Sequence, residues 1–215
     1  EFRRVLFRSP MGARGDASRP RIAPHSAAYY GTCALGGALS CGGTHLLVTP
    51  VDLVKCRRQV LPGGGGLRAA WADGGVRALY TGGVPTALGY AAQGACKFGF
   101  YEYFKRAYAA AAGPERAHAH RTLLYLGASA SAEAIADAAL CPFEALKVRM
   151  QTGGPRAPRH FFSGMASMLQ KDGLSGIYRG LPALWARQIP YTMVKFAAFE
   201  RAVEAIYARV LRRPK

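Results

Sequence analysis

One block of ten residues occurs twice in this chain. Residues 50–59 and residues 142–151 both read Pro-x-[Asp/Glu]-x-x-Lys-x-Arg-x-Gln, with an offset of 92 residues. Further matches follow in the same order and pair residues 75–82 with 173–180 and residues 97–102 with 195–200. Such ordered self-similarity indicates a repeat architecture, so we infer two copies of one unit of about 95 residues.

Each copy opens with an apolar stretch about as long as a bilayer is thick. Tyr29–Thr49 carries no side chain that is charged at neutral pH, and His45 is its one imidazole. Thr122–Cys141 carries two acids, Glu133 and Asp137. About 20 apolar residues suffice to cross the hydrocarbon core. A soluble helical bundle would need a polar face, which Tyr29–Thr49 lacks. The pattern therefore predicts an all-α membrane protein.

Each copy closes with a second apolar helix, near residues 84–107 and 181–208. A polar loop and a short amphipathic helix, such as Phe162–Lys171, are predicted between the two long helices. Small residues recur four apart, as at Gly37 and Cys41. This spacing lines one helix face with small groups, which lets neighbouring helices approach closely in lipid. We expect four membrane-spanning helices.

The composition tests two other classes of protein. The net charge is +17, yet only 19% of residues are charged and 50% are hydrophobic, so the excess reflects scarce acids. A nucleic-acid-binding protein would place its cations on wetted elements with interleaved aromatics, whereas here they gather near helix ends and short loops. No Ser/His/Asp set or phosphate-binding glycine loop indicates an enzyme. The five cysteines lack Cys-x-x-Cys spacing, so we predict packing roles and no metal or cofactor.

Both blocks place charged side chains just after a proline within a long apolar pattern. Pro50 and Pro142 should kink their helices, since proline removes a backbone hydrogen bond. An acid follows two residues later and a lysine five residues later. Charges at a membrane face are costly unless they are paired or wet. The pattern favours ion pairs between repeats that open and close.

The doubled block, followed by Gly-x-x-x-x-aromatic-[Lys/Arg]-Gly, closely resembles the mitochondrial carrier family. The similarity runs from Tyr29 to about Arg212. It implies repeats of two transmembrane helices around a central path in the mitochondrial inner membrane, with short helices on the matrix side. We expect a lead-in that includes a cloning scar over residues 1–28, a first repeat over 29–112 and a second over 118–212. The family has three repeats and six helices, so four helices of six and no third repeat are expected here.

The resemblance also implies two gates. The motif acid of one repeat pairs with the motif lysine of the next, so we expect Asp52 to pair with Lys147, whereas Glu144 and Lys55 would lack their partners from a third repeat. The matrix gate comprises Pro50, Asp52, Lys55, Gln59, Pro142, Glu144, Lys147 and Gln151. The cytoplasmic gate comprises Tyr101, Glu102, Lys105, Phe199 and Glu200. Two positions depart from the family pattern, Thr81 and Val203, where a cation is usual.

Local strings such as 93–102 and 187–192 resemble the phosphate-transporting members of that family. A phosphate is best held by cations and hydrogen-bond donors in a partly dehydrated cavity. Arg187 lies thirteen residues before Glu200, and the equivalent position before Glu102 is Gly89, so the repeats have diverged at this level. The predicted anion contacts are Arg187, Gln188, Gln93, Lys97 and Lys195. For each lysine, a snorkelling residue at the membrane edge remains the alternative.

His45, Glu133 and Asp137 are the predicted proton-coupling residues. Histidine titrates near neutral pH, intramembrane acids are usually functional, and the resemblance implies a histidine in the first helix and an acid in the third. We therefore predict electroneutral symport of phosphate with protons by a non-enzymatic, monomeric carrier. Anionic lipid, cardiolipin in particular, is the expected membrane partner. A carrier for another anion, such as a dicarboxylate, is the alternative.

Overall fold

A computed structural model describes residues 26–60, 66–153, 157–158 and 160–209. The expectations for the first 25 residues and the last six lie outside these ranges. All regular elements of the described part are helical. They are α2 (Ala27–Val60), α3 (Leu67–Ala72), α4 (Gly75–Leu79), α5 (Gly83–Ala112), α6 (Pro114–Ala119), α7 (Arg121–Thr152), α8 (Phe161–Ile177), the 3₁₀ turn η2 (Tyr178–Gly180) and α9 (Leu181–Arg209).

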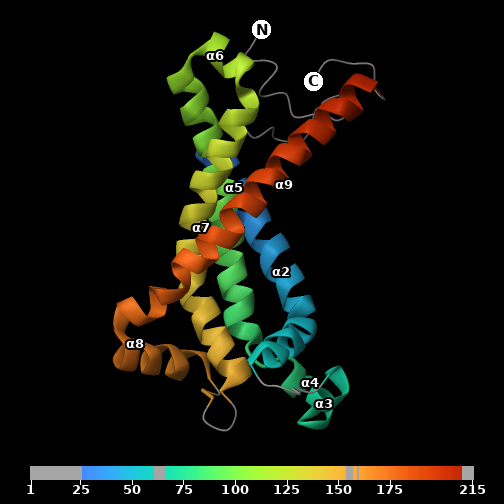
Figure 1. The fold of residues 1–215 in the computed structure, drawn as a ribbon, viewed down its shortest axis with the longest axis vertical. Helices are drawn as coiled ribbons and strands as arrows, with labels where there is room; N and C mark the ends of the chain where they lie inside the picture. Colours follow the sequence, from blue (N-terminus) through green and yellow to red (C-terminus); the bar gives the residue numbers. More distant parts are fainter. Residues whose placement is uncertain (1–25, 61–65, 154–156, 159, 210–215) are drawn as a thin grey trace.

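Four long helices dominate the structure. α2, α5 and α7 run side by side, and α9 crosses them obliquely (Figure 1). They contain 34, 30, 32 and 29 residues, which is ample length for a bilayer at 1.5 Å per residue. Pro50 and Pro142 lie inside α2 and α7, so each predicted first helix continues past its proline. Each half is thus a pair of long helices.

Glycine lets α2 and α5 touch at the backbone. A Cβ added to Gly37 would lie 2.3 Å from the carbonyl oxygen of Gly94, and one added to Gly94 would lie 2.2 Å from the carbonyl oxygen of Gly37. Five residues further along α2, Gly42 packs against Ala87 and Ala91. The small-residue stripe predicted around Gly37 therefore brings the two helices into close contact.

The helices α3, α4 and α8 pack on the lower ends of α2 and α7 at similar places in the two halves (Figure 1). Ala70 and Leu79, from α3 and α4, form a buried cluster with Leu53 of α2. In the second half, Met168 and Ile177 of α8 form the corresponding cluster with Leu146 of α7. The offset between these short-helix residues is 98 in both cases. The repeat seen in the sequence is thus also a repeat of packing.

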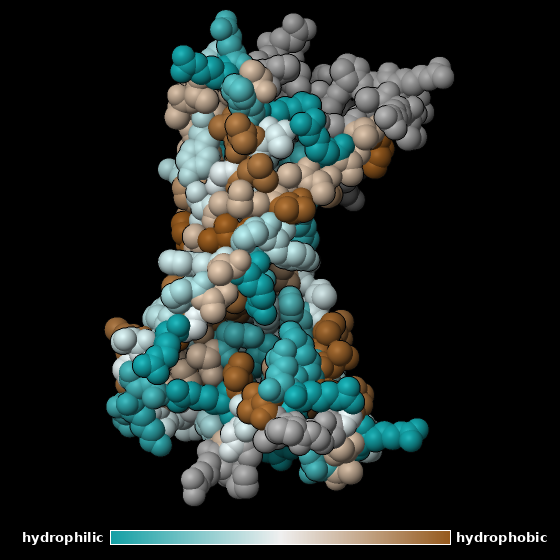
Figure 2. All heavy atoms as spheres, viewed as in Figure 1, coloured by the Kyte–Doolittle hydropathy of each residue, from teal (hydrophilic) through white to brown (hydrophobic). Residues whose placement is uncertain are grey.

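Hydropathy singles out one of the long helices. Among the described helices, α7 alone has both the length and the mean hydropathy of a typical membrane span. α2, α5 and α9 reach the length, but glycine, serine, threonine and charged residues lower their hydropathy. Figure 2 shows hydrophilic side chains gathered over the lower end around α8, with apolar side chains among them and above.

Candidate functional site

One face of α5 carries a row of polar and aromatic residues over most of its length. Tyr90, Gln93, Lys97, Tyr101 and Lys105 follow one another at spacings of three or four residues. Residues at these spacings share one side of a helix. We call these five residues the α5 column. Each of them contacts a side chain from another helix or from the next turn, so the column connects several groups of the candidate site.

The middle of the α5 column meets the two acids of α7. The Gln93 amide nitrogen donates to Asp137 Oδ1 at 3.0 Å and to Glu133 Oε1 at 3.3 Å. Lys97 Nζ lies 2.8 Å from Glu133 Oε2. Both carboxyl groups are fully buried, and Gln93 is 4% exposed. The four residues form what we call the central cluster.

The central cluster joins two sets of residues that the sequence suggested for different roles. Gln93 and Lys97 were predicted to bind the anion, and Glu133 and Asp137 to couple protons. The structure shows them in direct contact. The cluster has two acids for one cation, and Asp137 Oδ2 is buried without a hydrogen-bond partner in the described part of the chain. A proton bound to this oxygen, or a hydrogen-bond donor beside it, would satisfy its hydrogen-bonding capacity.

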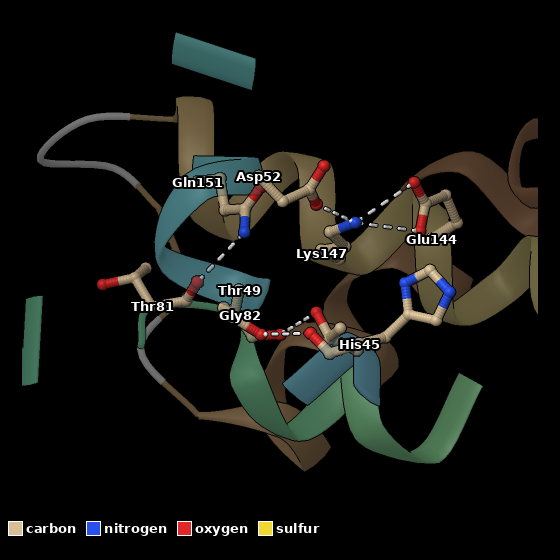
Figure 3. Close-up of polar contacts among 9 residues, drawn as sticks. His45, Thr49, Asp52, Thr81, Gly82, Glu144, Lys147 and Gln151 are labelled. Atoms are coloured by element: carbon tan, nitrogen blue, oxygen red, sulfur yellow. Dashed lines mark hydrogen bonds and ion pairs between the residues drawn. The ribbon is translucent and has the colours of Figure 1, made fainter. Parts of the chain in front are cut away.

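At the end that carries the predicted matrix gate, here called the matrix-side end, Lys147 of α7 joins two helices. Its ammonium group forms an ion pair with Asp52 of α2 and lies 3.3 Å from Glu144 on the preceding turn of α7 (Figure 3). The expected pair of Asp52 with Lys147 is present. Glu144, which was expected to lack a partner from a third repeat, contacts Lys147 of its own helix, because Lys147 reaches back one turn. Lys55 is exposed and has no ion-pair partner among the described residues.

The two motif glutamines have different surroundings. The Gln151 amide nitrogen donates to the backbone oxygen of Thr81 at 3.2 Å, which links α7 to the turn before α5 (Figure 3). That turn includes Gly82, whose φ of 79° favours glycine. Gln59, at the same motif position of α2, is exposed.

His45 belongs to the matrix-side group and not to the central cluster. Its imidazole stacks on the ring of Tyr90, with centroids 3.5 Å apart and an interplanar angle of 7°. Lys147 Nζ lies 5.4 Å from the centroid of the same ring. Thr49 donates to the backbone oxygen of His45 at 3.0 Å, just before Pro50. The structure thus separates the two predicted proton-coupling sites along α5.

The opposite end of the α5 column contains the residues predicted for the cytoplasmic gate. Lys105 Nζ lies 2.6 Å from Glu102 Oε1, and the Tyr29 hydroxyl donates to Glu102 Oε2 at 3.2 Å. The Tyr101 hydroxyl reaches Glu200 of α9 at 3.5 Å. Tyr101 is therefore the member of this group that connects the two halves. Phe199 is exposed.

The predicted anion contacts on α9 do not join the central cluster. Arg187 and Lys195 are exposed, and Gln188 is half-buried. Lys195 Nζ lies 5.8 Å from the ring of Tyr191, one turn back on α9. Among the described residues, none forms an ion pair or hydrogen bond with these three. Of the five predicted anion contacts, the structure brings together the two on α5.

Packing explains why position 89 holds glycine where α9 has Arg187. A Cβ on Gly89 would lie 2.6 Å from Cβ of Phe143 and 3.1 Å from Leu140 on α7. An arginine would therefore displace α7. The sequence suggested a divergence at this level, and the close approach of α5 to α7 gives its physical reason.

Sequence reasoning missed two aromatic residues of the site. Tyr90 joins His45 to Lys147, and Tyr29 contacts Glu102. Tyr90 had a usable signal, because it precedes Gln93 and Lys97 by one and two helical turns on one face. Tyr29 had none, because its contact is 73 residues away in the chain.

The described residues offer no group of His, Cys, Asp or Glu that could hold a metal ion. All five cysteines are free thiols, and Cys141, the buried one, donates to the backbone oxygen of Ile177 at 3.5 Å.

Comparison with known proteins gives this arrangement a family. The model of the mitochondrial carrier protein family matches residues 26–111 and again residues 118–209. The chain is 52% identical to mitochondrial phosphate carrier protein 3 of Arabidopsis thaliana over 90% of its own length and 53% of the relative's. It is 56% identical to the mitochondrial phosphate carrier protein of Caenorhabditis elegans, over 88% of its length and 57% of the relative's.

A human relative, solute carrier family 25 member 3, is 49% identical over 98% of the chain and 62% of its own length. The chain thus spans between half and two thirds of the length of these relatives. Two successive matches to the family model cover most of the chain, and the observed fold is that of paired long helices. The chain belongs to the mitochondrial carrier protein family, a family of multi-pass transporters, not enzymes, in the mitochondrial inner membrane.

Proposed function

We propose that this protein transports inorganic phosphate across the mitochondrial inner membrane. Relatives named as mitochondrial phosphate carriers match most of the chain at about half identity. The observation that supports the proposal best is the central cluster, where Lys97 contacts Glu133 in a buried, polar part of the helix pack. Lys97, whose side chain is 17% exposed, is a cation beside buried acids, and it offers an anion a binding charge that can be released again.

We further propose that Lys97 and Gln93 are the first anion contacts. Lys97 supplies a point charge, and Gln93 supplies an amide donor one turn away. Both are held by α7 acids, so an anion would exchange with an existing partner and would not enter an empty site. Arg187, Gln188 and Lys195 are proposed as contacts on α9 during a different stage of the cycle, when α9 turns this face toward the path.

Proton symport is the proposed coupling, with His45, Glu133 and Asp137 as carriers. The acids border Lys97, so a proton taken up there changes the charge beside the anion. The Asp52–Lys147 pair at one end and the Tyr101–Glu200 contact at the other are the proposed gate closures. A monomer that binds anionic lipid such as cardiolipin is part of the same proposal.

Uptake by liposomes tests this function. The 215-residue chain is reconstituted into proteoliposomes, and uptake of radiolabelled phosphate is followed with and without a pH gradient. We expect uptake that the gradient accelerates and that unlabelled phosphate suppresses. Lys97→Gln should lower uptake at least about tenfold, since a charge-assisted hydrogen bond contributes about 1.5–3 kcal/mol.

Arg106→Gln is the matched control, because Arg106 is an exposed cation on α5 outside the column. It should leave uptake within about twofold of the unmodified chain. If an unlabelled dicarboxylate suppressed uptake and unlabelled phosphate did not, the transported substrate would be the dicarboxylate. Phosphate uptake at the same rate with and without the pH gradient would contradict the proposed coupling to protons.

A further inference from the structure

Tyr90 is the residue through which α2, α5 and α7 meet at the matrix-side end. Its ring stacks face to face on His45 of α2 at 3.5 Å, and the ammonium group of Lys147 on α7 lies 5.4 Å from the same ring. Its hydroxyl makes no hydrogen bond to a described residue. Tyr90 thus interacts through the face of its ring and not through its polar end.

The His45 side of this arrangement can change its charge. A neutral imidazole stacks on a phenol ring by dispersion, whereas an imidazolium is a cation on the same π system. Lys147 is already a cation near that ring. Protonation of His45 therefore places two positive charges around one ring, and they repel each other.

Asp52 is affected by the same event. It lies seven residues after His45 on α2, so the two share one helix face, two turns apart. Asp52 is the α2 partner of Lys147. An imidazolium on that face attracts the carboxylate that Lys147 uses, while it repels Lys147 itself. Both effects weaken the ion pair between α2 and α7.

Several charged groups lie near His45. They are Lys147, Asp52, Lys97 and Lys195. Glu144 contacts Lys147 at 3.3 Å. When the Asp52–Lys147 ion pair breaks, Lys147 still has Glu144 as its partner. Lys147 therefore has an ion-pair partner both before and after α2 and α7 separate, which lowers the free-energy barrier to that separation.

We propose that Tyr90 is a positioning residue that transmits the protonation of His45 to the Asp52–Lys147 ion pair. In this scheme a proton on His45 loosens the matrix-side tie between α2 and α7. The inference rests on the proton role proposed for His45 and adds what the proton does there. It assigns a role to the ring face of Tyr90 alone.

Distance measurements between the ends of α2 and α7 test this inference without any transport assay. Spin labels are attached at Val60→Cys and Val148→Cys, both exposed, in a chain whose five cysteines are replaced by alanine. The labelled chain is placed in lipid nanodiscs, and electron–electron distances are compared at about pH 5.5 and about pH 8, on either side of the usual histidine range. We expect a longer and broader distance distribution at the lower pH.

Two substitutions of one residue separate the ring from the hydroxyl. Tyr90→Phe keeps the ring and should keep the response to pH, whereas Tyr90→Leu should abolish it. His45→Gln should abolish it as well, and this variant tests the idea even if Tyr90→Leu fails to fold. Three outcomes would each overturn the inference. The unmodified chain could show no pH response, the response could survive His45→Gln or Tyr90→Leu, or Tyr90→Phe could remove it. A chain that responds to pH but takes up no phosphate would contradict the proposed function and leave this inference standing.

Discussion

The two halves of this chain carry one motif in two different environments. In α7, the motif lysine Lys147 has a side chain that is 2% exposed and lies between two acids. In α2, the equivalent Lys55 is exposed. The motif glutamines differ in the same way, since Gln151 is buried against Thr81 and Gln59 is exposed. Identical motif residues thus acquire different roles from the helices beside them.

The second helices of the two halves show the same contrast. Lys97 of α5 is paired with a buried acid, whereas its repeat mate Lys195 of α9 is exposed. α5 packs against both α2 and α7, and α9 packs mainly against α7. A helix with neighbours on two sides has its polar residues enclosed, so they must find partners within the helix pack. The comparison teaches that the helix neighbours, more than the motif, decide which charge is buried.

Helix contacts within each half also differ. Gly37 and Gly94 meet backbone to backbone in the first half. The equivalent positions in the second half hold Ser129 and Thr192, both buried. Side chains in place of glycine keep backbones further apart. The first pair of helices is therefore held by close backbone contact, and the second by packed side chains.

The largest expected difference between the halves concerns the two equivalent lysines of α5 and α9. Lys97→Met leaves Glu133 and Asp137 buried without a cation, which should lower the free energy of unfolding by about 3–5 kcal/mol. Lys195→Met should cost less than about 1 kcal/mol, since Lys195 loses little more than a ring contact. Reversible unfolding in mixed detergent micelles measures both. Equal losses for the two variants would break the comparison.

The second largest difference in the free energy of unfolding is expected between the two matrix-side lysines, Lys147 and Lys55. Lys147→Gln removes the partner of Asp52 and Glu144, and we expect a loss of about 2–3 kcal/mol, below the full cost for a buried pair because both acids are partly exposed. Lys55→Gln should change the free energy of unfolding by no more than about 0.5 kcal/mol. The same unfolding assay distinguishes them. A large loss for Lys55→Gln would show that its position is enclosed in the membrane.

A third test contrasts two adjacent glycines of α2. Gly37→Ala should cost about 1–3 kcal/mol, because its Cβ would clash with the backbone of Gly94. Gly36→Ala meets no atom within 4 Å and should be neutral or stabilise the helix by up to about 1 kcal/mol. Ser129→Ala, the second-half equivalent of the first change, should cost less than Gly37→Ala. If both alanine variants of α2 unfold alike, the close backbone contact does not hold in solution.

The smallest effect concerns an ion pair that both halves share. The motif arginines Arg57 and Arg149 reach Asp73 and Asp172 at 3.0 and 2.6 Å. These pairs are partly exposed, so Arg57→Gln and Arg149→Gln should each cost less than about 1 kcal/mol. The two losses should be similar, because Arg57 is less exposed than Arg149 (24% against 44%) while Asp73 is more exposed than Asp172 (60% against 33%). Raising the salt concentration should shrink both losses, and losses that ignore salt would contradict a surface pair.

Much of this architecture could be predicted from the sequence, because repetition and periodicity are properties of the chain itself. The doubled motif predicted two equivalent pairs of helices, and glycine at Gly37 predicted a close helix contact. The Asp52–Lys147 pair followed from the family resemblance. The partners of Glu144, Gln93 and Lys97 did not follow, because each depends on which neighbouring side chain comes within reach.

The sequence by itself determined the helical repeat, the polar motif at the lower ends of α2 and α7 and the row of residues along one face of α5. Only the tertiary structure decided that Gln93 and Lys97 face Glu133 and Asp137, that His45 stacks on Tyr90, and that Arg187 does not join them. The physical reason is that helical periodicity fixes which residues share a face, whereas the partner of that face depends on how helices distant in the chain pack together.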